Sequence, residues 1–162
     1  MFDIGIITAS DRGSRGERED ISGKTVATML AGLGQVKYYV VVPDEKEALS
    51  GEIVHMADHL RLDLILTTGG TGLGPRDVTP EATLAVVDRE VPGIPEAMRA
   101  KSLEKTSRAM LSRAVAGIRG RTLIINLPGS PKGVRECLEV VLPALEHGLA
   151  ILKGETGECG EA

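Results

Sequence analysis

The residues with the clearest capacity for chemistry lie between Leu64 and Ala82, in the segment LILTTGGTGLGPRDVTPEA. An apolar run typical of a strand leads into Gly69-Gly70-Thr71-Gly72. Three glycines in four residues permit positive φ angles and leave backbone N–H groups uncovered, and such groups can face an anion. Asp77 and a helix start at Thr79-Pro80-Glu81 follow. The segment predicts a phosphate site, and a plain strand-to-helix turn with a surface Arg–Asp pair is the alternative.

Alternating strands and amphipathic helices must position these residues. Apolar runs predict strands at 3–9, 36–42, 64–66, 115–118 and 121–127. Helical spacing of apolar residues predicts helices between and after them. We expect an α/β fold: a three-layer sandwich with a mostly parallel sheet covered by helices on both faces.

Polar residues at recognisable positions mark the expected helix starts. Ser22 is the expected cap of the first helix, and Asp44 with Glu47 forms a capping-box pattern for the second. Thr79 is the expected cap of the next helix, and Ser130 is the expected cap of the last, with a proline at its first position.

Ligands of open parallel sheets bind outside the carboxyl ends of the strands. Ser10 and Asp11 follow the first expected strand, Asp44 the second, the glycine turn the third, and Asn126 with Gly129 the last. If these strands are parallel, all the groups lie along one rim. Two acids, a glycine turn and helix N-termini there suit a magnesium-bound polyphosphate. Asp44 as a simple helix cap is the alternative for that residue.

Length and composition limit the number of domains and the kinds of partner that the protein could bind. The 162 residues fit one domain, expected over residues 1–154, with a disordered tail over 155–162. One Phe, two Tyr and no Trp imply an aliphatic core and disfavour an aromatic platform for nucleic acid. A net charge of −4 without a basic run disfavours nucleic-acid and anionic-membrane partners.

Other compositional features point to a cytoplasmic protein. No apolar run approaches the ~20 residues of a membrane helix, and no secretory signal pattern is evident. Cys137 and Cys159 form no C-x-x-C pair, so the sequence indicates neither zinc nor a disulfide framework. Cys137 lies on an apolar helical stripe and is expected in the core.

Two further patterns suggest chemistry that their context does not support. Ser22-Gly23-Lys24-Thr25 resembles the end of a P-loop, but Arg18 stands where the motif needs glycine. His55 and His59 lie four residues apart, as paired metal ligands do, yet they face away from the apolar stripe and lack a third ligand. We interpret them as solvated histidines.

Taken together, the chain resembles the molybdopterin adenylyltransferase family, which includes the N-terminal domain of gephyrin. The matching motifs occur in family order over residues 4–153: TASD at 8–11, VPD at 42–44, TTGGTG at 67–72, RDVTPEA at 76–82, AMLSR at 109–113 and NLPG at 126–129. Molybdate-insertion domains and competence-damage-inducible proteins have a similar glycine turn but lack the combined TGGTG…RD-TPEA pattern.

The resemblance implies a reaction and residues that perform it. ATP and molybdopterin give adenylylated molybdopterin and pyrophosphate, with Mg²⁺ as cofactor and Asp44 and Asp77 as the catalytic and metal-holding residues. Thr68, the turn from Gly69 through Gly70 and Thr71 to Gly72, and Pro128-Gly129 are implied to bind nucleotide or phosphate. Implied contacts to pterin or its phosphate are Ser10, Asp11, Ser112 and Asn126.

The same resemblance implies a homotrimer, with a hexamer as the alternative, and a downstream molybdate-insertion protein as partner. Two other functions are weighed against the enzyme: a non-catalytic molybdopterin-binding or carrier protein, and a general nucleotide-binding scaffold. The pair Asp44 and Asp77 favours the enzyme, because a carrier has no need of two acids that position a metal.

Overall fold

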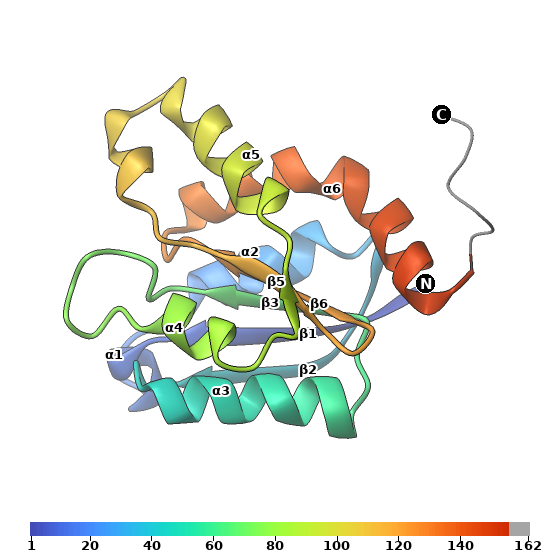
Figure 1. The fold of residues 1–162 in the computed structure, drawn as a ribbon. Coiled ribbons are helices and arrows are strands. Elements are labelled where there is room, and N and C mark those ends of the chain that lie inside the picture. Colours follow the sequence, from blue (N-terminus) through green and yellow to red (C-terminus); the bar gives the residue numbers. More distant parts are fainter. Residues whose placement is uncertain (156–162) are drawn as a thin grey trace.

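A six-stranded sheet forms the centre of the molecule in the computed structural model, which describes residues 1–155 (Figure 1). The strand order is β2-β1-β3-β6-β5-β4, with the first four strands parallel and β5 antiparallel to both of its neighbours. The strands are β1 (Phe2–Ala9), β2 (Gly34–Val42), β3 (Leu64–Thr68), β4 (Arg89–Glu90), β5 (Ala116–Arg119) and β6 (Thr122–Leu127). The expected mostly parallel α/β sheet is confirmed. The two-residue β4 was not predicted, since it is too short to give a periodic signal.

Helices cover both faces of the sheet, as expected. α2, α5 and α6 pack on one face, and α3, η1 and α4 on the other (Figure 1). The helices are α1 (Asp11–Ser14), α2 (Ile21–Met29), α3 (Lys46–Val54), the π-helix η1 (His55–His59), α4 (Thr79–Leu84), α5 (Gly93–Leu103), the 3₁₀-helix η2 (Ser107–Leu111) and α6 (Pro131–Lys153). No helix within residues 1–155 is long and apolar enough to cross a membrane.

Two aliphatic cores explain why the strands hold their register. Leu64 and Leu66 face the core beneath α2, α5 and α6, whereas Ile65 between them faces the core beneath α3 and α4. All three side chains are fully buried. Since side chains alternate along a strand, a one-residue slip of β3 would move each of these residues to the opposite face of the sheet. Each buried side chain of this size contributes roughly 1.5–3 kcal/mol, so such a slip would be strongly unfavourable.

The first expected helix cap is wrong. Asp20, not Ser22, caps α2: its carboxylate accepts a hydrogen bond from the Gly23 N–H at 2.9 Å. Ser22 lies inside the first turn of the helix, buried, where its hydroxyl donates to the Gly129 carbonyl at 2.6 Å. A tertiary contact therefore takes the serine that local pattern would use as a cap.

The caps expected for the next two helices are also wrong. Glu45 precedes α3 without a side-chain capping bond, because the Asp44 carboxylate turns to the loop after β1. Val78 precedes α4, and Thr79 is its first helical residue, with its hydroxyl buried beneath the glycine turn. The pattern located both helices but misplaced their first residues.

The last helix begins as expected. The Ser130 hydroxyl accepts from the Gly133 N–H at 3.0 Å, and Pro131 is the first helical residue. α6 continues through Pro143 to Lys153 as one helix. Cys137 is buried on its inner face, as predicted. The expected tail falls almost wholly on residues 156–162, outside the described part of the chain.

Candidate active site

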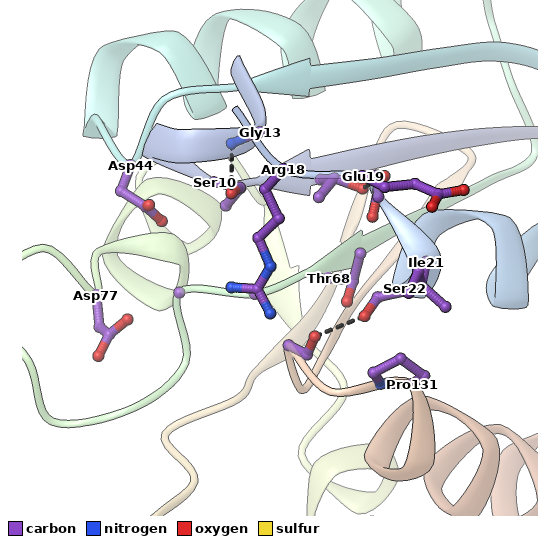
Figure 2. Close-up of a pocket in the computed structure, with 16 residues that line it drawn as sticks. Ser10, Gly13, Arg18, Glu19, Ile21, Ser22, Asp44, Thr68, Asp77 and Pro131 are labelled. Carbon is purple, nitrogen blue, oxygen red and sulfur yellow. Dashed lines mark hydrogen bonds between the residues drawn. The ribbon is translucent and has the colours of Figure 1, made fainter. Parts of the chain in front are cut away.

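A pocket of about 300 Å³ lies where β1, β2, β3 and β6 end (Figure 2). Four segments that are far apart in sequence meet there, which confirms the expected convergence at the carboxyl ends of the strands. The lining residues are Thr8, Ala9, Ser10, Gly13, Arg18, Glu19, Asp20, Ile21, Ser22, Asp44, Thr68, Gly69, Gly70, Asp77, Gly129 and Pro131.

The first half of the glycine turn, Gly69 and Gly70, lines this pocket, whereas Thr71 and Gly72 are not among its lining residues. Both of these lining positions require glycine. Gly69 and Gly70 have φ angles of 93° and 69°, in the left-handed region. A Cβ on Gly69 would lie 2.5 Å from the Ala9 carbonyl oxygen, and one on Gly70 would lie 2.2 Å from the Thr79 hydroxyl. The turn can therefore pass between β1 and α4 only without side chains.

Asp44 is held in place by the loop after β1. Its carboxylate accepts from the Asp11 N–H at 3.0 Å, and its own N–H donates to the Asp11 carboxylate at 3.0 Å. Burial raises the pKa of Asp44, and the nearby charges of Asp11 and Asp77 raise it further. An anionic carboxylate kept in this position would be stabilised by a cation in the pocket.

Asp11 is neutralised by an arginine from the far end of the glycine loop. Arg76 makes two contacts to the Asp11 carboxylate, at 2.9 and 3.1 Å, and these hydrogen bonds lower the pKa of Asp11. The pair closes the loop after β3 against α1. Asp11 is thus engaged beside the pocket and is not among the residues that line it.

Asp77 both lines the pocket and shapes its own loop. Its carboxylate accepts from the Gly74 N–H at 2.8 Å, and Figure 2 shows Asp77 and Asp44 at the same end of the pocket. Within residues 1–155 no group of three or more acidic, histidine or cysteine side chains is arranged to hold a metal. Mg²⁺ is usually bound by one or two carboxylates together with phosphate oxygens and water, so two aspartates fit a magnesium ion that binds with a phosphate.

The turn between β6 and α6 forms the opposite wall. The Thr68 hydroxyl donates to the Pro128 carbonyl at 2.7 Å, and the Gly69 N–H donates to the Leu127 carbonyl at 3.2 Å. Together with Ser22, which binds Gly129, these bonds attach the wall to both β3 and α2. The sequence offered no signal for this role of Ser22.

Arg113 is a further residue that sequence reasoning passed over. Its backbone and guanidinium N–H groups donate to the carbonyls of Thr71, Gly72 and Asp77, at 2.9, 2.8 and 2.6 Å. It also pairs with Glu81, whose pKa is lowered as a result. Arg113 thus binds three positions of the loop that carries Asp77, one through its backbone and two through its side chain. Its place in the AMLSR motif was the only signal.

The four residues expected to contact pterin do not meet in one place. Ser10 lines the pocket, where its hydroxyl accepts from the Gly13 N–H at 2.9 Å, and Asp11 lies beside it. Ser112 lines a second hollow of about 450 Å³ between α5, η2 and the start of α6. Pro128 lines this second hollow too, so the turn after β6 separates the two cavities.

Asn126 reaches neither cavity. Its side chain is fully buried, and its amide nitrogen donates to the hydroxyls of Thr67 and Thr83, at 3.0 and 2.9 Å. Its oxygen accepts from the Val115 N–H at 3.2 Å. The Asn126 side chain therefore joins β6 to β3 and α4. Its contact with pterin stays a prediction.

Comparisons with known proteins assign this chain to a family. The sequence model of the probable molybdopterin binding domain matches residues 5–147. The chain belongs to the molybdopterin-binding domain family.

Relatives in this family match nearly the whole chain. A molybdopterin adenylyltransferase from Helicobacter pylori (strain ATCC 700392 / 26695) is 45% identical over 98% of this chain and 92% of its own length. Gephyrin from Dictyostelium discoideum is 44% identical over 94% of this chain, which corresponds to 23% of that longer protein. The crystal structure of the molybdopterin biosynthesis enzyme MoaB from Thermus thermophilus is 56% identical, with a TM-score of 0.90, over 95% of this chain and 98% of that one. The family resemblance drawn from the motifs is confirmed.

Proposed function

We propose that this chain is a molybdopterin adenylyltransferase, which transfers AMP from ATP to molybdopterin and releases pyrophosphate in molybdenum cofactor biosynthesis. Relatives of this name match nearly the full chain. The observation that carries the proposal is the meeting of Asp44 and Asp77 with the glycine turn in one pocket. A protein that only carries pterin has no need of two carboxylates beside a phosphate-binding turn.

The glycine turn suits the phosphate chain of ATP. Thr68, Gly69, Gly70 and Gly129 line the pocket, where the glycines leave the backbone open to an anion. Thr71 and Gly72 follow in the same turn and Pro128 precedes Gly129, but these three residues are outside the pocket lining. Asp44 and Asp77 would hold Mg²⁺, which neutralises phosphate charge as it develops in the transition state. Arg113 and the Arg76–Asp11 pair fix the loop that carries Asp77, so this carboxylate is positioned before substrate arrives.

Molybdopterin is assigned to the remaining contacts. Ser112 opens on the second hollow, directly across the Pro128–Ser130 turn from the phosphate pocket, and Ser10 approaches from the first. A substrate that spans this turn would bring its phosphate to the glycine floor. Asn126 acts on this arrangement through the strands it joins.

The reaction needs position and charge neutralisation more than covalent help from the protein. An oxygen of the pterin phosphate bonds to the α-phosphorus of ATP, and the bond from that phosphorus to the bridging oxygen breaks. Pyrophosphate leaves with the electron pair. The attacking phosphate is already ionised, so no side chain has to remove its proton.

Assembly, partner and location complete the proposal. We propose a homotrimer, with a hexamer as the alternative, and transfer of the product to a molybdate-insertion protein. An apolar hollow of about 590 Å³ between α5, α6 and the edge of the sheet offers a surface for a second copy. Composition supports a location in the cytoplasm.

Asp77→Asn tests the proposed function. Asparagine keeps the shape and the acceptor for the Gly74 N–H but removes the charge, so it is a poor ligand for a hard cation. We expect pyrophosphate release from ATP and molybdopterin to fall by orders of magnitude. The thermal midpoint should change little, because Asp77 is part of a surface loop.

A titration of molybdopterin into the same variant is the control. Pterin binding should persist, since Ser10 and Ser112 are untouched. Near-normal turnover of Asp77→Asn would exclude the metal role. Loss of pterin binding with intact nucleotide binding would mean that the two substrates have been assigned to the wrong cavities.

A further inference from the structure

The charges around the phosphate pocket are unbalanced for a protein that binds phosphates. Four carboxylates line it, from Glu19, Asp20, Asp44 and Asp77. Arg18 is the one basic side chain among the described residues of the lining. Figure 2 shows it extending from the loop before α2 across the pocket, with its guanidinium in the space between Asp77 and Thr68 in this view.

The guanidinium of Arg18 has no partner in residues 1–155, whereas neighbouring charges on the same loop are paired. Arg15 contacts Glu17 at 3.1 Å, and Lys24 contacts Glu19 at 2.7 Å. A guanidinium is always charged and presents N–H donors in a fork that matches phosphate oxygens. An unpaired one over an acidic pocket is therefore available to an anionic ligand.

The loop that carries Arg18 is anchored at both ends. At its start the Glu17 N–H donates to the Arg12 carbonyl at 3.0 Å. At its end the Asp20 carboxylate accepts from the Thr8 hydroxyl at 2.5 Å, and also from the Tyr39 hydroxyl and the Gly23 N–H. These bonds tie the loop to β1, β2 and α2. Arg18 thus projects from a braced segment, which reduces the entropy lost when it binds.

We propose that Arg18 is a substrate-binding residue that contacts a phosphate group of the reactants, a role that rests on the proposed adenylyl transfer. The shared chemistry is a phosphate group with anionic oxygens, either in the triphosphate of ATP or at the end of molybdopterin. Arg18 supplies the positive charge that the rest of the lining lacks, opposite the two aspartates. Because Glu19 is already paired with Lys24, Arg18 and a bound cation are left to offset the charges of Asp44 and Asp77.

Binding of inorganic tripolyphosphate tests this without relying on activity. Arg18→Ala should weaken its binding in the presence of Mg²⁺ by about ten-fold or more, as loss of a charge-assisted contact does. Arg18→Lys should recover only part, because an ammonium lacks the fork. Arg15→Ala is the matched control: it removes the same charge from the same loop outside the pocket and should change binding by less than about two-fold.

Kinetics of the same variants identify which phosphate is bound. A rise in KM for ATP alone assigns Arg18 to the triphosphate, and a rise in KM for molybdopterin, with weaker binding of inorganic phosphate, assigns it to the pterin phosphate. Unchanged constants in Arg18→Ala, or equal losses in Arg15→Ala, overturn the proposal. If tripolyphosphate binding depends on Arg18 but the parent chain releases no pyrophosphate, the proposed function fails and the Arg18 site stands.

Discussion

At the scale of single residues, Asp44 shows how function strains a fold. Its carboxylate is half-buried next to two other acids, and both effects raise its pKa. A carboxyl group whose pKa is higher in the folded than in the unfolded chain costs stability once it ionises. This stability is lost as pH rises from the ordinary aspartate pKa through the raised one. The enzyme keeps an anion in a position where the fold would favour a neutral group.

Asp44→Asn should therefore be at least as stable as the parent chain at neutral pH, while adenylyl transfer is lost. The amide retains an acceptor for the Asp11 N–H and removes the like charge. The stability difference should shrink in acid, where Asp44 is protonated in both folded and unfolded chains. Urea unfolding at neutral and acidic pH measures it. Glu45→Gln, an exposed neighbour, is the control, and a variant clearly less stable than its parent at neutral pH would contradict the argument.

At the scale of elements, the glycine turn depends on what passes over and under it. β1 lies against Gly69, α4 against Gly70, and the turn after β6 against both β3 and α2. Local sequence explains why the turn can form, since glycine tolerates positive φ. Only the packing of β1 and α4 explains why no other residue fits at Gly69 and Gly70.

Gly70→Ala should destabilise the chain by at least about 2 kcal/mol and reduce activity, because strain at a positive φ adds to a collision with Thr79. Gly120→Ala is the comparison: its φ of 58° gives similar strain, but open space surrounds it. We expect that variant to lose only about 1 kcal/mol and to keep its activity. Chemical denaturation of both variants gives the difference, and equal losses would show that the collision is relieved at no cost.

At the scale of the whole molecule, the apolar hollow between α5, α6 and the sheet edge lies away from the active site. Val91, Ile94 and Ile151 are among its lining, and Ile151 is 42% exposed. An open apolar surface of this kind on a protein with few aromatic residues is typical of an interface between subunits.

Ala144→Glu should disrupt the proposed trimer. Ala144 is exposed on α6 and lines the hollow, so glutamate is compatible with the helix but not with an apolar interface. Light scattering should give about three chain masses for the parent and less for the variant. Ala31→Glu, at an exposed turn that does not line the hollow, should leave the mass unchanged. A parent chain with the mass of a single subunit would overturn the proposed assembly.

The layers of the fold, and the edge of the sheet on which the site lies, follow from the amino-acid sequence. Each strand and helix must bury an apolar face, so the spacing of the apolar residues along the sequence indicates where strands and helices alternate. The parallel order of β1, β2, β3 and β6 then brings Ser10, Asp44, the glycine turn and Gly129 together. Motifs in family order added the activity.

Which polar groups are free to bind a ligand depends on packing between segments that are distant in sequence. In the sequence, Ser22 and Asn126 are polar residues near a helix start and a strand end. In the structure, both side chains form hydrogen bonds within the fold. Arg18 occupies a position where a P-loop would need glycine, and in the structure its side chain extends over the pocket. A side chain's partners come from segments distant in sequence, so local pattern cannot tell a satisfied polar group from an available one.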